Sequence, residues 1–457
     1  AERAPGPSVA ASPDPEVWLV RHAQSEANAA GVWQGQTESD LTTRGREQVE
    51  ALARRVDRAR RWFGEFDLVV SSPLRRARET AAVFGTPAID PGFVEINLGR
   101  WEGMTRTELA ATDLKELDAL GRGENVRFGE VGESIVELTH RVVAATDRVF
   151  SQLAPGGRAV VVTHGGVLDV LVERVFGRIG GRRIGGFPEN TSISRWVRRF
   201  GQDRMVGFND VAHLGRRPRL VEKALETDRA VLALVRHGRT SANVEGRWQG
   251  HTDWGLDEVG RLQAGRLAEL YPGFHRVVSS PLGRAWQTAA HLHPNPEPVP
   301  DLSELAFGKW EGLTAGEIRQ GWPRLFDEIF VHGRDVARGE TGETWSQLAQ
   351  RISRAVATLE ADAGQVTGVV THGAAIRAYL GSLAGIGWDR SQVYDTPANA
   401  SVSHIVLGPE GPVVADFGNT AHLEELATWK NSPSGRIGHP EGLTTLPGVD
   451  RSGRLRR

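Results

Sequence analysis

The first half of the chain contains three short apolar runs, each bounded by polar residues. They span residues 17–20, 68–71 and 159–163. Runs of this length, rich in valine, are typical of strands buried inside a domain. Arg21 and His22 follow the first run directly, and ligands of open α/β sheets bind just beyond the carboxyl ends of strands. We therefore expect this Arg-His pair at the mouth of a site.

Amphipathic segments lie between these runs. Apolar residues at positions 49, 52, 53 and 56 share one helical face, and Thr42 or Thr43 can cap the start of that helix. Residues 75–84 and 135–150 predict two further helices, and Pro73 suits a first helical turn. Strands that alternate with helices predict a parallel or mostly parallel sheet in a layered α/β domain.

The same pattern occurs twice. His22 and Asn28 recur 215 residues later as His237 and Asn243. Further along, the separation falls to 208 or 209 for three more pairs: Arg76 with Arg284, Glu95 with Glu304, and His164 with His372. The first copy therefore carries about seven extra residues between positions 41 and 76, which we interpret as a longer loop. A period near 210 residues indicates a duplicated domain and not a solenoid repeat.

This repeat divides the chain into four parts. They are a Pro/Ala-rich arm (1–15), a first domain (16–222), a second domain (230–426) and a Gly/Pro/Arg-rich tail (427–457). Residues 220–230 join the domains. Because the tail is poor in large apolar residues, we expect it to lack a core of its own.

Composition excludes several classes of protein. The 457 residues carry a net charge of only −2, so no global field attracts nucleic acid or an acidic membrane. The absence of cysteine excludes disulfides, thiolate chemistry and cysteine-ligated zinc. No apolar run approaches the roughly 20 residues of a membrane span, and the first fifteen residues lack the apolar core of a signal peptide. We expect a cytoplasmic protein with neither nucleic acid nor membrane as a partner.

Each copy offers the same set of chemically useful side chains. It comprises an Arg-His pair, a second histidine, an arginine that opens a helix, and a glutamate in a loop flanked by glycine. Arginine presents a fork of donors that matches phosphate oxygens. A neutral imidazole is a competent nucleophile, and a carboxyl group can protonate a leaving oxygen and later accept a proton from water. This set suits the transfer of a phosphoryl group.

Five separated motifs recur in the same order in both copies: RH(A/G) followed by Asn, SSPLxRAxxTA, ExxxGxWEG, GE(S/T) and THG. They resemble the motifs of the histidine phosphatase superfamily, also called the phosphoglycerate mutase-like family. This resemblance covers roughly 400 residues. It implies two tandem three-layer α/β/α domains with mostly parallel central sheets, and catalysis without a metal or other cofactor.

The resemblance also implies roles for individual residues. His22 and His237 match the histidine that is phosphorylated during turnover, and Glu95 and Glu304 match the proton donor. The phosphoryl oxygens would be held by a set of arginine and histidine side chains: Arg21, Arg76 and His164 in the first copy, and Arg236, Arg284 and His372 in the second. Asn28 and Asn243 match a position that lines the phosphate pocket.

The leading hypothesis is a phosphomonoester hydrolase with a complete site in each domain. It would act on small phosphorylated metabolites through a phosphohistidine intermediate. A phosphoglycerate mutase-type phosphoryl transferase is one alternative, and a regulatory or binding module with one inactive domain is another. The physiological substrate and a homo-oligomeric state stay open.

The segments that follow the WEG motif differ between the copies, so specificity is expected to differ as well. The first segment offers Arg122, Arg127 and Phe128, and the second offers His332, Arg334 and Arg338. We expect the first pocket to favour a bulky or apolar leaving group, and the second to favour a substrate with a second anionic group.

Overall fold

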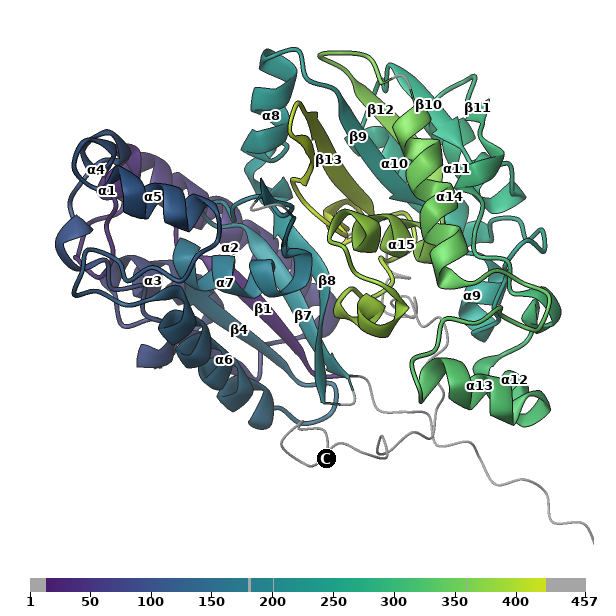
Figure 1. The fold of residues 1–457 in the computed structure, drawn as a ribbon, viewed down its shortest axis with the longest axis horizontal. Coiled ribbons are helices and arrows are strands. Elements are labelled where there is room, and N and C mark those ends of the chain that lie inside the picture. The colour runs from purple at the N-terminus through teal and green to yellow at the C-terminus, as the bar shows by residue number, and fades with distance from the viewer. Residues whose placement is uncertain (1–13, 180–181, 200, 360, 425–457) are drawn as a thin grey trace, which may run out of the picture.

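The computed structural model describes residues 14–179, 182–199, 201–359 and 361–424 (Figure 1). Most of the predicted arm and the whole predicted tail, 427–457, lie outside the described residues. No helix in the described part of the chain is long and apolar enough to cross a membrane.

The first domain is built on a six-stranded sheet with the order β3-β2-β4-β1-β7-β8. Its first four strands are parallel, and β7 and β8 continue the sheet antiparallel beside β1. The strand bounds are β1 (Glu16–Arg21), β2 (Leu68–Ser71), β3 (Ala88–Ile89), β4 (Arg158–Thr163), β7 (Ile193–Arg199) and β8 (Gln202–Asp210). All three predicted strands are present, in a mostly parallel sheet.

Helices cover both faces of this sheet. Their bounds are α1 (Glu26–Ala29), α2 (Thr43–Phe63), α3 (Arg75–Ala81), α4 (Arg106–Thr112), α5 (Leu114–Gly121), α6 (Ile135–Ser151) and α7 (Gly165–Phe176). Val17 and Leu19 of β1 pack in one core cluster with α6 and α7, whereas Trp18 and Val20 pack in another with α2 and α3. Successive side chains of a strand point to opposite faces, so these two clusters define the outer layers of an α/β/α domain.

The second domain repeats this architecture with the strand order β11-β10-β12-β9-β13-β14. The strands are β9 (Val231–Arg236), β10 (Arg276–Ser279), β11 (Glu297–Pro298), β12 (Val366–Thr371), β13 (Val402–Gly408) and β14 (Gly411–Val414). The helices are α9 (Ser241–Glu245), α10 (Glu258–Leu270), α11 (Gly283–Leu292), α12 (Ala315–Gly321), α13 (Pro323–Phe330), α14 (Trp345–Thr358) and α15 (Gly373–Leu383).

Two local predictions are wrong. The extra residues of the first copy do not lengthen a loop: α2 has 21 residues and its counterpart α10 has 13, so they extend a helix. Thr42 caps α2 as expected, by accepting a hydrogen bond from the Gly45 amide. Pro73 does not open α3, because the helix begins at Arg75 with Leu74 as its N-cap.

The segment that joins the domains forms a helix, α8 (Arg219–Glu226). It buries Val221 and Ala224 in a core cluster with β9 and β13. The linker helix therefore packs on the second domain, beside the edge that faces the first (Figure 1).

The two domains meet through equivalent surfaces. Phe208 and Phe417, which are equivalent positions of the two copies, form an antiparallel bridge with hydrogen bonds of 2.9 and 3.1 Å. Two further bridges flank it and exchange equivalent positions: Gly185 with Val414, and Tyr394 with Met205. This reciprocity is the mark of a two-fold, isologous interface, here formed within one chain.

Candidate active site

Strand β1 delivers His22 to the carboxyl end of the sheet. The amide of His22 continues the pairing with β4 by donating to Thr163 O at 2.8 Å, and the side chain is only 2% exposed. His237 follows β9 in the same way, with its amide 3.0 Å from Thr371 O. Both predicted nucleophiles therefore lie at a strand end, with their backbone held by the sheet.

One hydrogen bond fixes the tautomer of each of these imidazoles. Nδ1 of His22 lies 2.7 Å from Ala23 O, and Nδ1 of His237 lies 2.7 Å from Gly238 O. A carbonyl oxygen can only accept, so Nδ1 carries the hydrogen and Nε2 keeps its lone pair. Nε2, the atom that would act as the nucleophile in the predicted role, is thus unprotonated in both copies. Neither Ala23 nor Gly238 has a positive φ, so the alanine in the first copy introduces no backbone strain.

The surroundings of His22 keep its ring neutral. Burial lowers its pKa well below 6.5, and the positive charges of Arg76 and Arg21 lower it further. The pKa of His237 is lowered by burial and then by Arg284 and Arg236. A protonated ring could not act as a nucleophile, so these shifts favour the reactive form at neutral pH.

This lowering can be measured directly. In protein labelled at histidine, the ring signals of His22 and His237 should keep the shifts of the neutral form when the pH falls from 8 to 6, because both pKa values lie well below 6.5. The variants His22→Gln and His237→Gln assign the two signals. A midpoint at pH 6.5 or above for either ring would contradict the electrostatic description of the site.

A second histidine faces the nucleophile in each copy. The ring centroids of His22 and His164 are 5.0 Å apart, and those of His237 and His372 are 5.2 Å apart. Nε2 of His164 lies 2.6 Å from Ser72 Oγ, an atom that already accepts a hydrogen bond from the Leu74 amide. We assign the hydroxyl hydrogen to this contact, which leaves the ring hydrogen on Nδ1. His164 can then donate to an anion beside His22.

The arginines are held by backbone carbonyls and not by carboxylates. Arg21 donates through Nη1 to Pro188 O at 2.8 Å, and Arg76 donates to Thr37 O and Gly35 O at 2.9 and 2.8 Å. Arg236 and Arg284 make the equivalent bonds in the second domain. Burial lowers the pKa of Arg21 and Arg236 to about 10, so both stay charged at neutral pH. A carbonyl fixes a guanidinium without neutralising its charge.

The same donor atoms lack a partner in both copies. Buried nitrogens without a hydrogen bond include Nε of Arg21 and Arg76 and Nδ1 of His164, and their counterparts share this property: Nε of Arg236 and Arg284 and Nδ1 of His372. An unsatisfied buried donor costs about 1–3 kcal/mol, so its repetition in both copies calls for an acceptor. A phosphoryl group supplies several such oxygens.

The predicted proton donor is held at the start of a helix. Glu95 Oε1 accepts from the Ile96 amide at 2.9 Å, and Oε2 accepts from the Gly166 amide, in the first turn of α7, at 3.1 Å. Glu304 repeats this with the amides of Leu305 and Ala374 at 2.9 and 3.2 Å. Each oxygen keeps a further lone pair for a proton.

Glu133 acts on this loop indirectly. Its carboxylate pairs with Arg141 at 2.7 Å, and Arg141 donates to Val94 O and Gly92 O, just before Glu95. Glu343 and Arg351 form the same pair in the second domain. These acids position the proton donor without facing the reacting group.

The asparagines form a link that the sequence analysis missed. Asn28 Oδ1 accepts from Asn190 Nδ2 at 3.0 Å, and the same Asn190 group donates to His22 O at 2.9 Å. Asn399 makes both bonds in the second copy. The next residue is left-handed in each case, with φ of 60° at Thr191 and 57° at Ala400. The repeated NTSIS and NASVS segments were the signal, since each begins with this asparagine.

In the first domain these residues surround one cavity of about 420 Å³. Its lining brings together five of the six residues predicted for this site: Arg21, His22, Asn28, Arg76 and Glu95. The sixth, His164, is placed beside them by its contact with the His22 ring. Apolar walls come from side chains such as Phe128, Leu98 and Phe187.

The structure agrees with the expectation for Phe128 but not with the one for Arg338. Phe128 lines the first pocket, as expected, although it is only 7% exposed and also packs on Trp101. The expectation that Arg338 offers its charge to a ligand is wrong. That side chain is 1% exposed, donates to Asp335 at 2.8 Å and lies over the Trp388 ring. Its charge is already compensated inside the fold.

A sequence profile described as "Histidine phosphatase superfamily (branch 1)" matches the chain twice, over residues 17–211 and 232–420. The chain belongs to the histidine phosphatase superfamily. Both matches contain the complete set of predicted residues. This tandem histidine phosphatase is therefore a phosphoryl hydrolase or transferase of that superfamily.

Its curated relatives carry several activities in their names. A metal-independent phosphoserine phosphatase from Arabidopsis thaliana is 33% identical and aligns with 35% of this chain and 68% of its own length. A probable phosphoglycerate mutase from Erwinia tasmaniensis is 34% identical, over 39% of this chain and 83% of its own. A glucosyl-3-phosphoglycerate phosphatase from Mycolicibacterium vanbaalenii is 31% identical, over 41% and 85%.

Solved structures also resemble one domain of the chain. A phosphoserine phosphatase from Entamoeba histolytica, in complex with 3-phosphoglyceric acid, is 27% identical and has a TM-score of 0.39. The match covers 42% of this chain and 98% of that one.

Proposed function

We propose that the chain is a phosphomonoester hydrolase with two working sites, each of which passes its substrate through a phosphohistidine. The observation that carries this proposal is the matched set of unpaired donors around an unprotonated Nε2 in both copies. Small phosphorylated metabolites fit a cavity of about 420 Å³.

In the first half-reaction, Nε2 of His22 attacks phosphorus and the bond from phosphorus to the leaving oxygen breaks. A proton from Glu95 goes to that oxygen, which departs as an alcohol. Arg21, Arg76 and His164 donate to the three phosphoryl oxygens while negative charge spreads over them.

In the second half-reaction, water attacks the phosphohistidine. Glu95, now ionised, takes a proton from the water, and the bond from phosphorus to Nε2 breaks. Phosphate leaves, and both His22 and Glu95 return to their starting states. His237 and Glu304 follow the same steps in the second domain.

Completeness of both sites argues against a regulatory module with one inactive domain. Each copy keeps the nucleophile with its fixed tautomer, the carbonyl-held arginines and the carboxylate bound by two amides. A mutase must also retain a phosphorylated intermediate while the substrate reorients, and no residue pattern in the chain points to that step.

Hydrolysis and transfer can be separated in one assay. Incubation with a panel of phosphorylated metabolites, including phosphoserine and 3-phosphoglycerate, should release inorganic phosphate in proportion to substrate consumed. Isomerised phosphoglycerate should stay below the amount of phosphate released. Rapid isomerisation with little phosphate would favour the mutase instead.

Turnover should continue in the presence of a chelator. Two arginines and a histidine already supply positive charge and donors to the phosphoryl group in each site, and a relative is named as metal-independent. The described residues hold no group of three or more His, Asp or Glu that could bind a metal ion. The rate with EDTA should equal the rate without it, whereas loss of activity that magnesium restores would contradict the proposal.

A further inference from the structure

A second, larger cavity adjoins the first-domain site. It has a volume of about 1470 Å³ and lies between the two domains. Residues of the first domain, the linker helix α8 and the turn between β13 and β14 of the second domain all line it. We call it the interdomain cleft. Arg21, Trp33, Leu120, Arg178 and Phe187 line both cavities, so the cleft opens onto the catalytic pocket.

The cleft is strongly basic. Nine arginine or lysine side chains line it, against two glutamates. The whole chain has 55 basic and 57 acidic residues, so this ratio is a local concentration and not a consequence of composition. A cleft lined by one sign of charge focuses the field and raises the local concentration of counter-ions.

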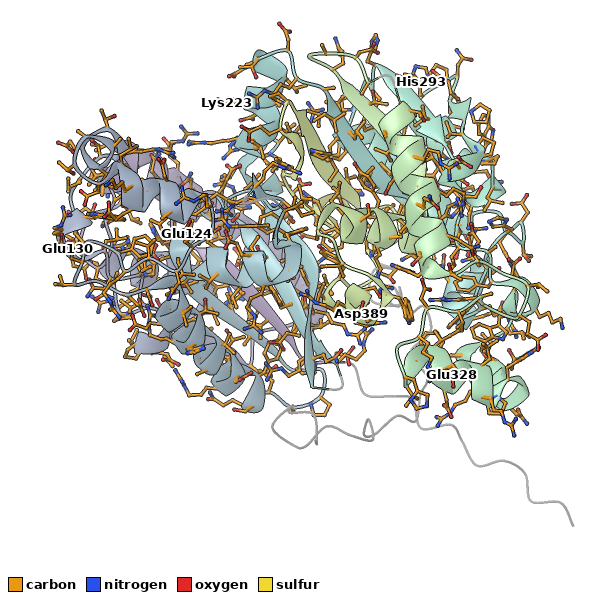
Figure 2. All side chains as sticks on the ribbon, in the orientation of Figure 1. Glu124, Glu130, Lys223, His293, Glu328 and Asp389 are labelled. Carbon is orange, nitrogen blue, oxygen red and sulfur yellow. The ribbon has the colours of Figure 1, made fainter. Side chains whose placement is uncertain are left out.

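Much of this charge is uncompensated. Within the described residues no carboxylate lies within ion-pair distance of six of the nine: Arg21, Arg106, Arg182, Arg219, Lys223 and Arg229. Glu189 is already bound by Arg216 at 2.6 Å. Figure 2 marks Lys223 on α8, at the edge of the second domain nearest the first. Lys223 and Arg229 are both exposed.

The cleft is connected electrostatically to the chemistry. Arg219 is among the cations whose charge lowers the pKa of Arg21, which binds the phosphoryl group in our proposed function. Phe187, which lines both cavities, is a 48% exposed aromatic ring with Arg21 at 5.2 Å and Arg183 at 5.7 Å from its centroid. An apolar part of a substrate could rest on this ring while its far end reaches α8.

The equivalent side of the second domain differs. The β7–β8 hairpin of the first domain is the counterpart of the β13–β14 hairpin: its Arg199 pairs with Asp14 and Asp395 at 2.6 and 3.2 Å, and its Arg204 donates to Gln392 at 2.8 Å. Thr396 also stands where the first copy has Phe187. The contacts that the partner domain makes beside the two sites therefore differ.

We propose that the first-domain site takes phosphomonoesters whose leaving group carries a second, distal phosphate, and that Arg219, Lys223 and Arg229 hold this phosphate in the interdomain cleft. The inference rests on the proposed function, because it names the substrate class of the His22 site. It also assigns the linker helix α8 and the β13–β14 turn of the second domain a share in that site.

The test uses the full chain with His237→Ala, so that only the first site turns over. Two substrates share one scissile group: 1,6-hexanediol bisphosphate, whose two ends are identical, and 6-hydroxyhexyl phosphate. Because either end of the bisphosphate can react, its kcat/KM should be twice that of the monophosphate even if the distal phosphate is not bound. We expect a ratio about tenfold above two at low salt, mainly through a lower KM for the bisphosphate. This ratio should fall as the salt concentration rises. The analogue 6-carboxyhexyl phosphate distinguishes a carboxylate from a phosphate at the far end.

Charge-reversal variants then test whether the preference for the bisphosphate depends on the cations of the linker. Lys223→Glu with Arg229→Glu should reduce the ratio to about two, whereas Arg354→Glu, an exposed arginine on α14, should leave it unchanged. The corresponding alanine variants give the same information if the reversed pair does not fold. In the His22→Ala background, where only the second site works, the reversal should have no effect on the ratio.

Two results would overturn the inference: a ratio near two in the parent, or a high ratio that survives the reversal. If 6-carboxyhexyl phosphate gained as much in kcat/KM as the bisphosphate, the cleft would recognise any anion at the far end and the proposed specificity for a phosphate would be wrong. Failure of the proposed function is a separate result, since the His237→Ala enzyme would then hydrolyse neither compound, nor p-nitrophenyl phosphate.

Discussion

Replacement of both His22 and His237 by alanine is expected to lower phosphatase activity by at least about four orders of magnitude, because each site loses the atom that forms its covalent intermediate. Each single variant should keep activity on at least one substrate, since the other site stays intact. The measurement is phosphate release from a panel of monoesters, together with acid-labile labelling of the protein by radioactive substrate.

A matched control is available on the surface. His140 is an exposed histidine on α6, so His140→Ala should leave both rate and labelling unchanged. Because His22 and His237 are buried, His→Gln variants and a melting curve should show that lost activity does not reflect lost folding. Full activity in the double variant would exclude the phosphohistidine.

Labelling also reports on each domain separately. The His237→Ala protein should carry label on His22 alone, and the His22→Ala protein on His237 alone, with about one phosphate per chain at most. If only one of the two proteins were labelled, the other domain would be inactive despite its complete set of site residues, which would favour the alternative of a regulatory domain.

The apolar pattern was sufficient to place both predicted nucleophiles at strand ends. An apolar run that ends in Arg21 and His22 favours a strand end, and its recurrence at Arg236 and His237 argues against a chance pattern. Interpretation of the helices was less secure. The extra residues of α2 form two more helical turns, because helix length depends on what the helix packs against and not on its own pattern.

Residues that act through the backbone were harder to predict. Asn190 binds His22 O from a position 168 residues away, and the repeated NTSIS and NASVS segments mark this asparagine but not its partner. Arg338 is the converse case. Its charge suggested a ligand, but Asp335, three residues earlier, and the distant Trp388 together bury it. Whether a charge is free depends on tertiary neighbours, which the chain's linear order does not reveal.

The interdomain cleft also depends on tertiary contacts that the order of residues along the chain does not reveal. Six of its nine cations come from the first copy and three from the linker, whereas the second copy contributes the turn at residues 408–411. Two-fold pairing of Phe208 with Phe417 brings the β13–β14 turn next to the first site. Duplication within one chain thus gave the first site a wall that a single domain lacks.

Glu95→Gln and Glu304→Gln, each tested with the other site inactivated, should slow hydrolysis of an alkyl or sugar phosphate by about two to four orders of magnitude. Glutamine keeps the size of the side chain but has no carboxyl proton to give the leaving oxygen. The loss should shrink to about tenfold or less with p-nitrophenyl phosphate, whose leaving group departs with little protonation.

The control separates proton transfer from positioning. Glu133→Gln weakens the ion pair with Arg141, which holds the backbone just before Glu95, but leaves the Glu95 carboxyl group intact. It should therefore slow both substrates by the same factor. Glu95→Gln also loses one of the two amide hydrogen bonds to the carboxylate, so part of its effect will be common to both substrates. The excess loss on the alkyl phosphate measures the acid role, and an equal loss on both would reduce Glu95 to a positioning residue.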